Sequence, residues 1–204
     1  MPLTPSQFHS ADGVDDWRVL YYLVSAHFRT ESLAQGVPLA AAVAALDTDP
    51  APRVDLRQNG VTVTLTSRDV ALARRISAAA AELGLTSDPS AVQVINVMTD
   101  ALAIPEVLPF WCAVLGYRQI GDDFAGDPHG RGPGFDFQPM DVPRPQRNRI
   151  HIDIAVPHEQ AEARVAAALA AGGHLVSDAH APKWWTLADP EGNEACIATW
   201  RGRE

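Results

Sequence analysis

The sequence predicts an α+β protein of two domains, and three observations carry that prediction. Residues 1–88 combine strand-like runs and long Ala-rich helical runs around Asn59-Gly60, a dipeptide typical of a tight β-hairpin. Residues 91–204 contain an internal repeat in which one strand, one helix and three further strands recur. The breaker residues Ser87-Asp88-Pro89 stand between the two parts and mark the boundary.

The composition is that of an ordinary globular protein. Of the 204 residues, 47% are hydrophobic and 20% are charged, which is enough apolar material for two small cores. The formal net charge of −9 repels phosphate backbones, so no nucleic-acid partner is expected. No signal peptide or membrane-length apolar stretch is recognisable, and the two cysteines suit reduced, buried thiols. We therefore expect a cytoplasmic protein without a membrane partner.

The elements of the first domain follow from apolar spacing and from capping residues. Two aromatic and β-branched runs near its start fit two strands or one helix, and Thr30 is the expected N-cap of the helix that follows. Asp69 is the expected N-cap of a second helix. The predicted elements are runs at 17–23 and 26–29, a helix from 30 to about 46, hairpin strands 54–56 and 61–65, and a helix 70–83.

The two copies of the repeat in the second domain keep the same spacing. Gly116 and Gly173 each follow a predicted helix, and they lie 57 residues apart. One copy is too small to cover both faces of its own sheet, so the two copies should pair. The elements with bounds that can be read from the sequence are strand 92–98, helix 105–115 and strands 117–120 and 134–138 in the first copy, and strand 150–156, helix 159–171 and strands 174–176 and 194–199 in the second. The remaining strand of each copy lies before its last strand.

Three segments of the second domain carry a family resemblance. NVMTD…FWCAVLGY, NRIHIDIAV and WWTLADPEGNEACI, all within residues 91–200, resemble the vicinal oxygen chelate superfamily of glyoxalases, extradiol dioxygenases and bleomycin-resistance proteins, and within it the glyoxalase-like branch. The resemblance implies two paired βαβββ units whose sheets curl into a cleft. In the metal-dependent members, four side chains from the first and last strands of the units hold one divalent ion.

The resemblance places these four metal positions on residues of mixed suitability. They are Gln93, Asp136, His151 and Cys196. Cys196 stands where the family has a glutamate, and a soft thiolate suits zinc better than harder ions. We therefore expect no cofactor, with a divalent metal (zinc, manganese, nickel or iron) as the alternative.

Four further residues are predicted to line the ligand site. Asp153 lies two residues after His151, so the two side chains share one face of the predicted strand. The pair suits acid–base chemistry, or the two groups simply hydrogen-bond to each other in a buried polar region. Glu194 shares the face of Cys196 by the same spacing. Of the adjacent Trp184 and Trp185, one ring must face the core and the other the opposite side, where it stacks on a ligand or simply packs.

The first domain carries a second resemblance, to pterin-4a-carbinolamine dehydratase. It covers about residues 12–85, through DWRVLYYLVSAHFRTESLAQGVPLAAAVAAL, VDLRQNGVTVTLTS and RDVALARRISAAAAELGL, and implies a four-stranded antiparallel sheet with helices in an oligomeric protein. The catalytic His-His-Pro of that family reads Thr48-Asp49-Pro50 here, and the second catalytic histidine is absent from Thr66-Ser67-Arg68-Asp69. Because imidazoles carry the proton transfers of that dehydration, we expect an inactive domain, residues 1–88, used for oligomerisation or pocket formation.

Three functions stay open at the level of the sequence. The first is a glyoxalase/bleomycin-resistance-like protein that binds a small organic molecule in the cleft without a strong metal site. The second is a metal-dependent lyase, isomerase or dioxygenase acting on a vicinal-oxygen substrate. The third is residual 4a-hydroxytetrahydrobiopterin dehydratase activity. The sequence does not decide whether the protein is an enzyme, and paired sheets are compatible with a homodimer.

Overall fold

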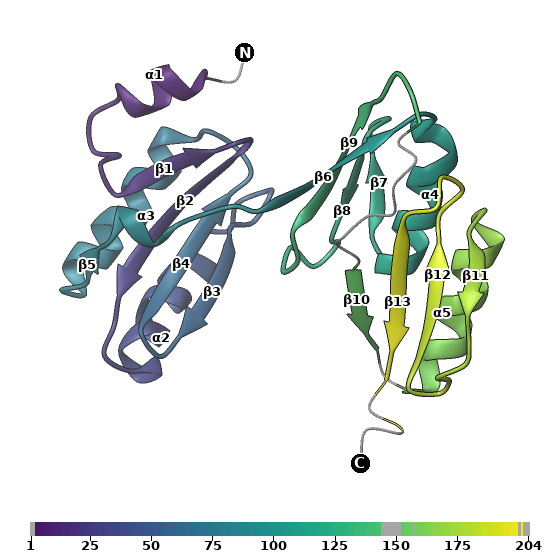
Figure 1. Cartoon of the computed structure of the whole chain (residues 1–204). Helices are drawn as coiled ribbons and strands as arrows, with labels where there is room; N and C mark the ends of the chain where they lie inside the picture. Colours follow the sequence, from purple (N-terminus) through teal and green to yellow (C-terminus); the bar gives the residue numbers. More distant parts are fainter. Residues whose placement is uncertain (1–2, 144–151, 157, 200, 202–204) are drawn as a thin grey trace. The chain divides into compact units, whose positions relative to one another are not determined.

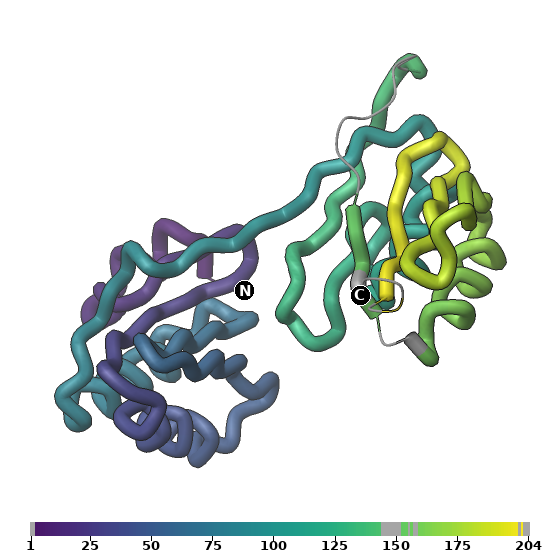
Figure 2. The backbone as a smooth tube through the Cα atoms, turned by 60° about the horizontal axis from the view of Figure 1, so that its bottom comes forward, coloured from purple at the N-terminus to yellow at the C-terminus, as the bar shows by residue number. Residues whose placement is uncertain are grey.

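The structure, a computed structural model, describes residues 3–143, 152–156, 158–199 and 201 (Figure 1). The protein is α+β, as predicted, and divides into two compact units, Met1–Val94 and Ile95–Glu204. Figure 2 traces the backbone from the first unit through the short 3-10 helix η1, Pro89–Ala91, into the first strand of the second. Within the described residues, no helix combines the length and the apolar character needed to cross a membrane.

The first unit is built on one antiparallel sheet with the strand order β1-β2-β4-β3. A short fifth strand, β5, pairs with the end of β2, so the residues that the sequence suggested as a boundary extend this sheet. The elements are α1 Pro5–His9, β1 Trp17–Leu20, β2 Leu23–Arg29, α2 Leu33–Ala44, β3 Arg53–Arg57, β4 Gly60–Leu65, α3 Val70–Glu82 and β5 Thr86–Ser87.

Local chemistry explains most of these boundaries. The predicted β3–β4 hairpin is confirmed, with Gly60 paired to Arg57 across the turn. Asp69 caps α3 as predicted, because its carboxylate accepts a hydrogen bond of 2.9 Å from the Leu72 backbone amide. The prediction of Thr30 as the cap of α2 is wrong. Ser32 accepts from the Gln35 amide instead, whereas the Thr30 hydroxyl is buried and donates to the Gln58 carbonyl.

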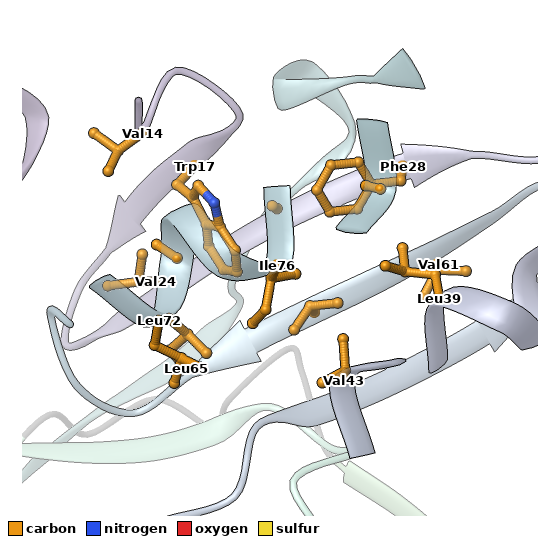
Figure 3. Packing of buried hydrophobic residues seen from close by; sticks show 14 of the residues in the cluster. Val14, Trp17, Val24, Phe28, Leu39, Val43, Val61, Leu65, Leu72 and Ile76 are labelled. Carbon is orange, nitrogen blue, oxygen red and sulfur yellow. The ribbon is translucent and has the colours of Figure 1, made fainter. Parts of the chain in front are cut away.

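The core of the first unit lies between the sheet and the helices α2 and α3 (Figure 3). Phe28 on β2, Val61 on β4 and Leu39 on α2 are almost completely buried there. Residues alternate along a strand between the two faces of a sheet, so the neighbours Ser25 and His27 lie on the face away from the helices. That face is polar, and its hydroxyl and imidazole groups bond across the strands, as in the Ser25–Thr64 pair.

The second unit confirms the internal repeat. Its two four-stranded sheets have the orders β6-β9-β8-β7 and β10-β13-β12-β11, and in each the first strand runs parallel to the last while the other pairs are antiparallel. The elements are β6 Asn96–Ala101, α4 Ile104–Leu115, β7 Arg118–Ile120, β8 Phe124–Gly126, β9 Gly134–Pro139, β10 Ile152–Ala155, α5 His158–Ala170, β11 His174–Ser177, β12 Trp184–Ala188 and β13 Glu194–Ala198.

The helices α4 and α5 pack on their own sheets and on each other, so both copies share one core. Gly116 was predicted to end the helix α4, and its backbone has the left-handed conformation that glycine commonly adopts at a helix end. Gly173 is needed for a different reason, since any Cβ there would collide with the buried ring of Phe110 on α4. The Arg164 side chain on α5 donates to the Val114 carbonyl on α4 and adds a polar link between the copies.

Two details of the second unit differ from the prediction. The first strand begins at Asn96 rather than Val92, so Gln93 precedes it and falls within the first compact unit. The strand β8 lies between the predicted strands 117–120 and 134–138, where no element was predicted from the sequence. Its three residues are too few to produce an alternating pattern that the sequence alone would reveal.

Candidate ligand-binding faces

The first sheet of the second unit has one face on the helices and one face without them. Phe135 and Phe137 of β9 point into the shared core, so Asp136 between them points the other way. Met98 of β6 lies beside Asp136 in register, and Phe124 of β8 lies on its other side. We call this surface the first open face. Its members are Asn96, Met98, Asp100, Ile120, Phe124, Asp136 and Gln138.

The first open face carries large apolar side chains that the fold leaves uncovered. Ile120 is 58% exposed and Met98 is 54% exposed. The Phe124 ring lies over Gly134, where a Cβ would meet the ring directly. Asp136 is partly exposed and lies between Met98 and Phe124, with Ile120 beyond Phe124 on the same face. A carboxylate on a face with exposed apolar side chains suits recognition of an organic molecule.

The second sheet has an equivalent open face, with a different character. Ile154, Leu187 and Ile197 pack into the core, and the residues that alternate with them face away. In register across β10, β13 and β12 lie Asp153, Cys196 and Thr186. We call this surface the second open face. Its members are Asp153, Trp184, Thr186, Glu194 and Cys196.

Cys196 is the most buried member of the second open face. Its Sγ lies 3.6 Å from the Thr186 hydroxyl, and the side chain is 8% exposed. Burial raises the pKa of the Cys196 thiol, the Thr186 hydrogen bond opposes that shift, and the neighbouring carboxylates of Asp153 and Glu194 add to it. A thiol with a raised pKa is protonated at neutral pH, which makes Cys196 a poor nucleophile.

The two adjacent tryptophans divide between the faces, as strand alternation requires. Trp185 packs against the shared core. Trp184 lies on the open side, where the His180 ring stacks on it with centroids 4.2 Å apart and the Lys183 ammonium lies 5.3 Å from its centroid. The Trp184 ring is thus already in contact with the side chains of His180 and Lys183. A ligand that stacks on this ring would have to displace one of them or bind to a part of the ring that they leave uncovered.

The residues at the four family metal positions do not form a matching ligand set where the structure describes them. Asp136 and Cys196 are on the expected last strands, β9 and β13. Gln93 is not on β6, and His151 lies outside the described residues. In the described part of the chain, no group of three or more His, Cys, Asp or Glu side chains is arranged to hold a metal ion. The described residues therefore do not fit the family's metal centre.

The segments that the dehydratase resemblance implied as catalytic, Thr48-Asp49-Pro50 and Thr66-Ser67-Arg68-Asp69, lie in loops next to the β3–β4 hairpin of the first unit. Arg53 pairs with Thr64, so the loops containing Thr48 and Arg68 leave the β3–β4 hairpin at the same end. The Thr48 Oγ1 and Arg68 Nε atoms are buried without a hydrogen-bond partner. One carboxylate oxygen of Asp69 accepts from the Leu72 amide as the cap of α3.

Two sequence motifs meet in a buried hydrogen-bond network that the sequence did not reveal. Asp189, in the DPEGNE segment, is completely buried and accepts from Trp111 Nε1 at 3.0 Å, in the FWCAVLGY segment. It also accepts from the backbone amides of Glu191 and Asn193 and from the Asn193 side chain. Glu191 in turn accepts from the Ala103 amide at the start of α4. These motif residues join the two copies of the repeat.

Comparison with known proteins agrees with this architecture. The family described as "Glyoxalase-like domain" matches residues 96–198, about half of the chain and wholly inside the second unit. The chain belongs to this glyoxalase-like family. A comparison with curated proteins found no match.

Several solved structures resemble the glyoxalase-like domain. A glyoxalase/bleomycin resistance protein/dioxygenase family enzyme from Burkholderia phytofirmans PsJN is 20% identical, covering 51% of this chain and 95% of its own, with a TM-score of 0.40. A glyoxalase-related enzyme from Fulvimarina pelagi is 16% identical, covering 52% and 87%, with a TM-score of 0.41. The fosfomycin resistance protein FosX from Mesorhizobium loti is 8% identical, covering 53% and 90%, with a TM-score of 0.42.

Proposed function

We propose that the glyoxalase-like domain binds a small organic molecule on its open faces and needs no resident metal to do so. The observation that carries the proposal is the pair Met98 and Ile120. Both side chains are more than half exposed; Met98 lies next to Asp136 in register, and Ile120 lies on β7 beyond Phe124 on the same face. Single exposed apolar residues are common on protein surfaces, but a group of them around a polar residue on an uncovered sheet face is typical of a binding site.

The second open face supplies the polar complement of this site. Asp153, Thr186 and Glu194 offer carboxylate and hydroxyl groups that can fix the orientation of a ligand. The ligand that best suits both faces has an apolar or aromatic body with hydrogen-bond donors at one end. Such a ligand buries the exposed apolar area and donates hydrogen bonds to the carboxylate oxygens.

A binding screen with the full chain tests this proposal. Fragments with an aromatic body and donor groups are screened by ligand-detected NMR, and the affinity of each hit is measured by calorimetry. Ile120→Asp and Asp136→Asn should each weaken a hit by roughly tenfold or more, because one removes apolar contact and the other a charged acceptor.

The matched control for this screen is Val142→Asp. Val142 is 60% exposed, like Ile120, but it lies in the turn after β9, outside the open faces. It should leave binding unchanged. If every hit bound all variants equally well, or if no hit lost affinity in Ile120→Asp, the open faces would not be the binding site.

A metal-dependent lyase, isomerase or dioxygenase is the second candidate. The observation in its favour is that Asp153, Glu194 and Cys196 share one face. It is tested by elemental mass spectrometry on untagged protein purified without chelator and then soaked with zinc, manganese, nickel or iron. We expect no stoichiometric ion. An ion that remains after dialysis and is lost in both Asp153→Ala and Cys196→Ala would favour the metal-dependent candidate instead.

A further inference from the structure

In the loop between β11 and β12, the imidazole of His180 covers part of the Trp184 ring. The two ring centroids lie 4.2 Å apart and the ring planes are inclined by 29°, which is a stacked arrangement. Trp184 is half-buried on the second open face, whereas His180 is exposed. Flat rings attract each other in this geometry, so the same place on Trp184 suits any other planar ring. His180 therefore occupies a position that an aromatic ligand would take.

The backbone of this loop is held in place independently of the imidazole. The His180 carbonyl accepts from the amides of Lys183 and Trp184, at 2.9 and 3.3 Å, and these bonds fix the backbone of His180 close to Trp184. At the end of the loop, Thr199 donates its hydroxyl to the Pro182 carbonyl at 2.6 Å and its amide to the Lys183 carbonyl at 2.9 Å. The loop therefore keeps its shape whether or not the imidazole lies on Trp184.

The imidazole itself is held by the stacking contact. Within the part of the chain that the structure describes, neither ring nitrogen of His180 makes a hydrogen bond. A rotation about its side-chain bonds removes the ring from Trp184 without breaking one, and exposed side chains make such rotations on the order of nanoseconds. The Lys183 ammonium is farther from the indole, at 5.3 Å from its centroid, and has no flat surface that competes with a planar ring. The group that an aromatic ligand displaces is therefore His180.

We propose that His180 is a replaceable cover on Trp184, and that a planar ring of the ligand displaces the imidazole and stacks in its place. This inference rests on the proposed function, because it assigns the aromatic body of the same ligand to one ring of the second open face. Thr186 lies two residues farther along β12 on that face, about 7 Å from Trp184 by strand geometry. Asp153 lies in the same cross-strand row as Thr186. The ligand class is a flat aromatic ring with a hydrogen-bond donor that reaches this row.

The cover makes the site selective for flat rings at some loss of affinity. The imidazole shields the indole from water while no ligand is bound. A ligand binds on Trp184 only in chains whose cover is displaced, so its apparent affinity falls by the fraction of chains that are open. A planar ring restores the stacking contact that the imidazole gives up, whereas an aliphatic ring does not. The cover therefore discriminates against aliphatic ligands of the same size.

Binding of two matched probes to the full chain tests the cover. Benzamidine has a flat ring and an amidinium donor, and cyclohexanecarboxamidine has the same donor on a puckered ring. We expect His180→Ala to lower the dissociation constant of benzamidine about fivefold in an NMR titration, because the probe no longer has to displace the imidazole. The dissociation constant of cyclohexanecarboxamidine should stay unchanged. The control His174→Ala removes another exposed histidine, on β11 of the same sheet, and should change neither value.

Two further variants show whether the effect acts through the indole. In a Trp184→Ala background, His180→Ala should leave benzamidine binding unchanged, because the platform is missing. Without any probe, fluorine NMR of protein labelled with fluorotryptophan should show a shift of the Trp184 resonance in His180→Ala, since the ring current of the imidazole is lost. That resonance is assigned by its absence in Trp184→Phe, and it should not move in His174→Ala. Far-UV circular dichroism checks that each variant is folded.

The outcomes separate this proposal from the proposed function. The cover is overturned if the Trp184 resonance is the same with and without His180, or if benzamidine binds His180→Ala no more tightly than the wild type. It is also overturned if the gain in affinity persists in the Trp184→Ala background. If His180→Ala tightens benzamidine binding while Ile120→Asp leaves it unchanged, the cover is supported and the first open face is not part of the site.

Discussion

At the scale of single residues, Asp189 shows that one residue of a family motif can serve the fold, while Glu194 at the end of the same motif lies on the second open face. Its carboxylate accepts hydrogen bonds from the indole of Trp111, from two backbone amides and from the Asn193 side chain, and it is completely buried. The turn it stabilises is completed by Gly192, which has a positive φ of 90°. The DPEGNE segment is therefore a structural joint between α4 and the β12–β13 turn.

Replacement of Asp189 should destabilise the second unit strongly. Asp189→Ala leaves the Trp111 indole and at least two further donors unpaired in the interior, so we expect a loss of about 3 kcal/mol or more in the free energy of unfolding. Asp189→Asn keeps one carbonyl oxygen and should lose less. Urea denaturation followed by tryptophan fluorescence measures both. Asp141→Ala, at an exposed turn position, is the control, and an equal loss there would contradict this assignment.

Cys196 predicts a dependence of stability on alkaline pH. Burial raises the pKa of this thiol above its ordinary value of 9.0, so the folded state resists the ionisation that the unfolded state undergoes freely. This contribution to stability is complete below pH 9 and is lost as the pH rises through the raised value. Urea midpoints measured between neutral pH and about pH 10 should fall less steeply for Cys196→Ala than for the wild type. Parallel slopes would show that the thiol is accessible to solvent.

At the scale of elements, the helices begin where polar side chains satisfy their first amide groups. The α2 and α3 helices use Ser32 and Asp69 as caps, and α1 has a full capping box formed by Thr4 and Gln7. The helix α4 lacks a side-chain cap of its own, because Ala103 is at that position. The Glu191 carboxylate, from the other copy of the repeat, accepts from the Ala103 amide instead.

The cap of α3 can be tested by two substitutions at one position. Asp69→Ala removes the acceptor for the Leu72 amide and should lower the stability of the first unit by about 1 kcal/mol. Asp69→Asn retains a cap of similar strength and should lie close to the wild type. Thermal unfolding by circular dichroism compares the three proteins. A loss in the Asn variant as large as that in the Ala variant would indicate a role for the charge itself.

At the scale of the whole molecule, the chain has two separate hydrophobic cores. The cluster around Trp17, Phe28 and Leu39 belongs to the first unit, and the cluster around Phe110, Phe135 and Ile197 to the second. The described members of the two clusters have no residue in common. Stability arises from contacts within each core, so a substitution in one core should leave the other nearly unaffected.

This separation can be measured on the intact chain by hydrogen exchange. Asp69→Ala should increase exchange in peptides from β2, β4 and α3, and leave peptides from α4 and β13 near their wild-type rates. Asp189→Ala should do the reverse. If each substitution accelerated exchange in both sets of peptides to the same degree, the two units would have to unfold as one cooperative structure.

Local sequence determined the parts of this protein that depend on neighbouring residues. The Asn59-Gly60 hairpin, the Asp69 cap and the Gly116 helix end follow from residues close together in the chain. The internal repeat follows from the recurrence of such local elements, and the structure confirms all four. The family of the second unit also followed from short motifs. Even the error at Thr30 was local, since it and Ser32 are both good capping residues two positions apart.

Tertiary structure decided which residues share a surface. Met98, Ile120 and Asp136 come from three separate strands, and only the register of the sheet brings them together on the first open face. The start of β6 excluded Gln93 from that sheet, and the buried Asp189–Trp111 bond joined motifs 78 residues apart. Strand register and core packing depend on contacts between segments that are distant in the chain. A single sequence does not show which segments pair with which, so these features could not be predicted from it.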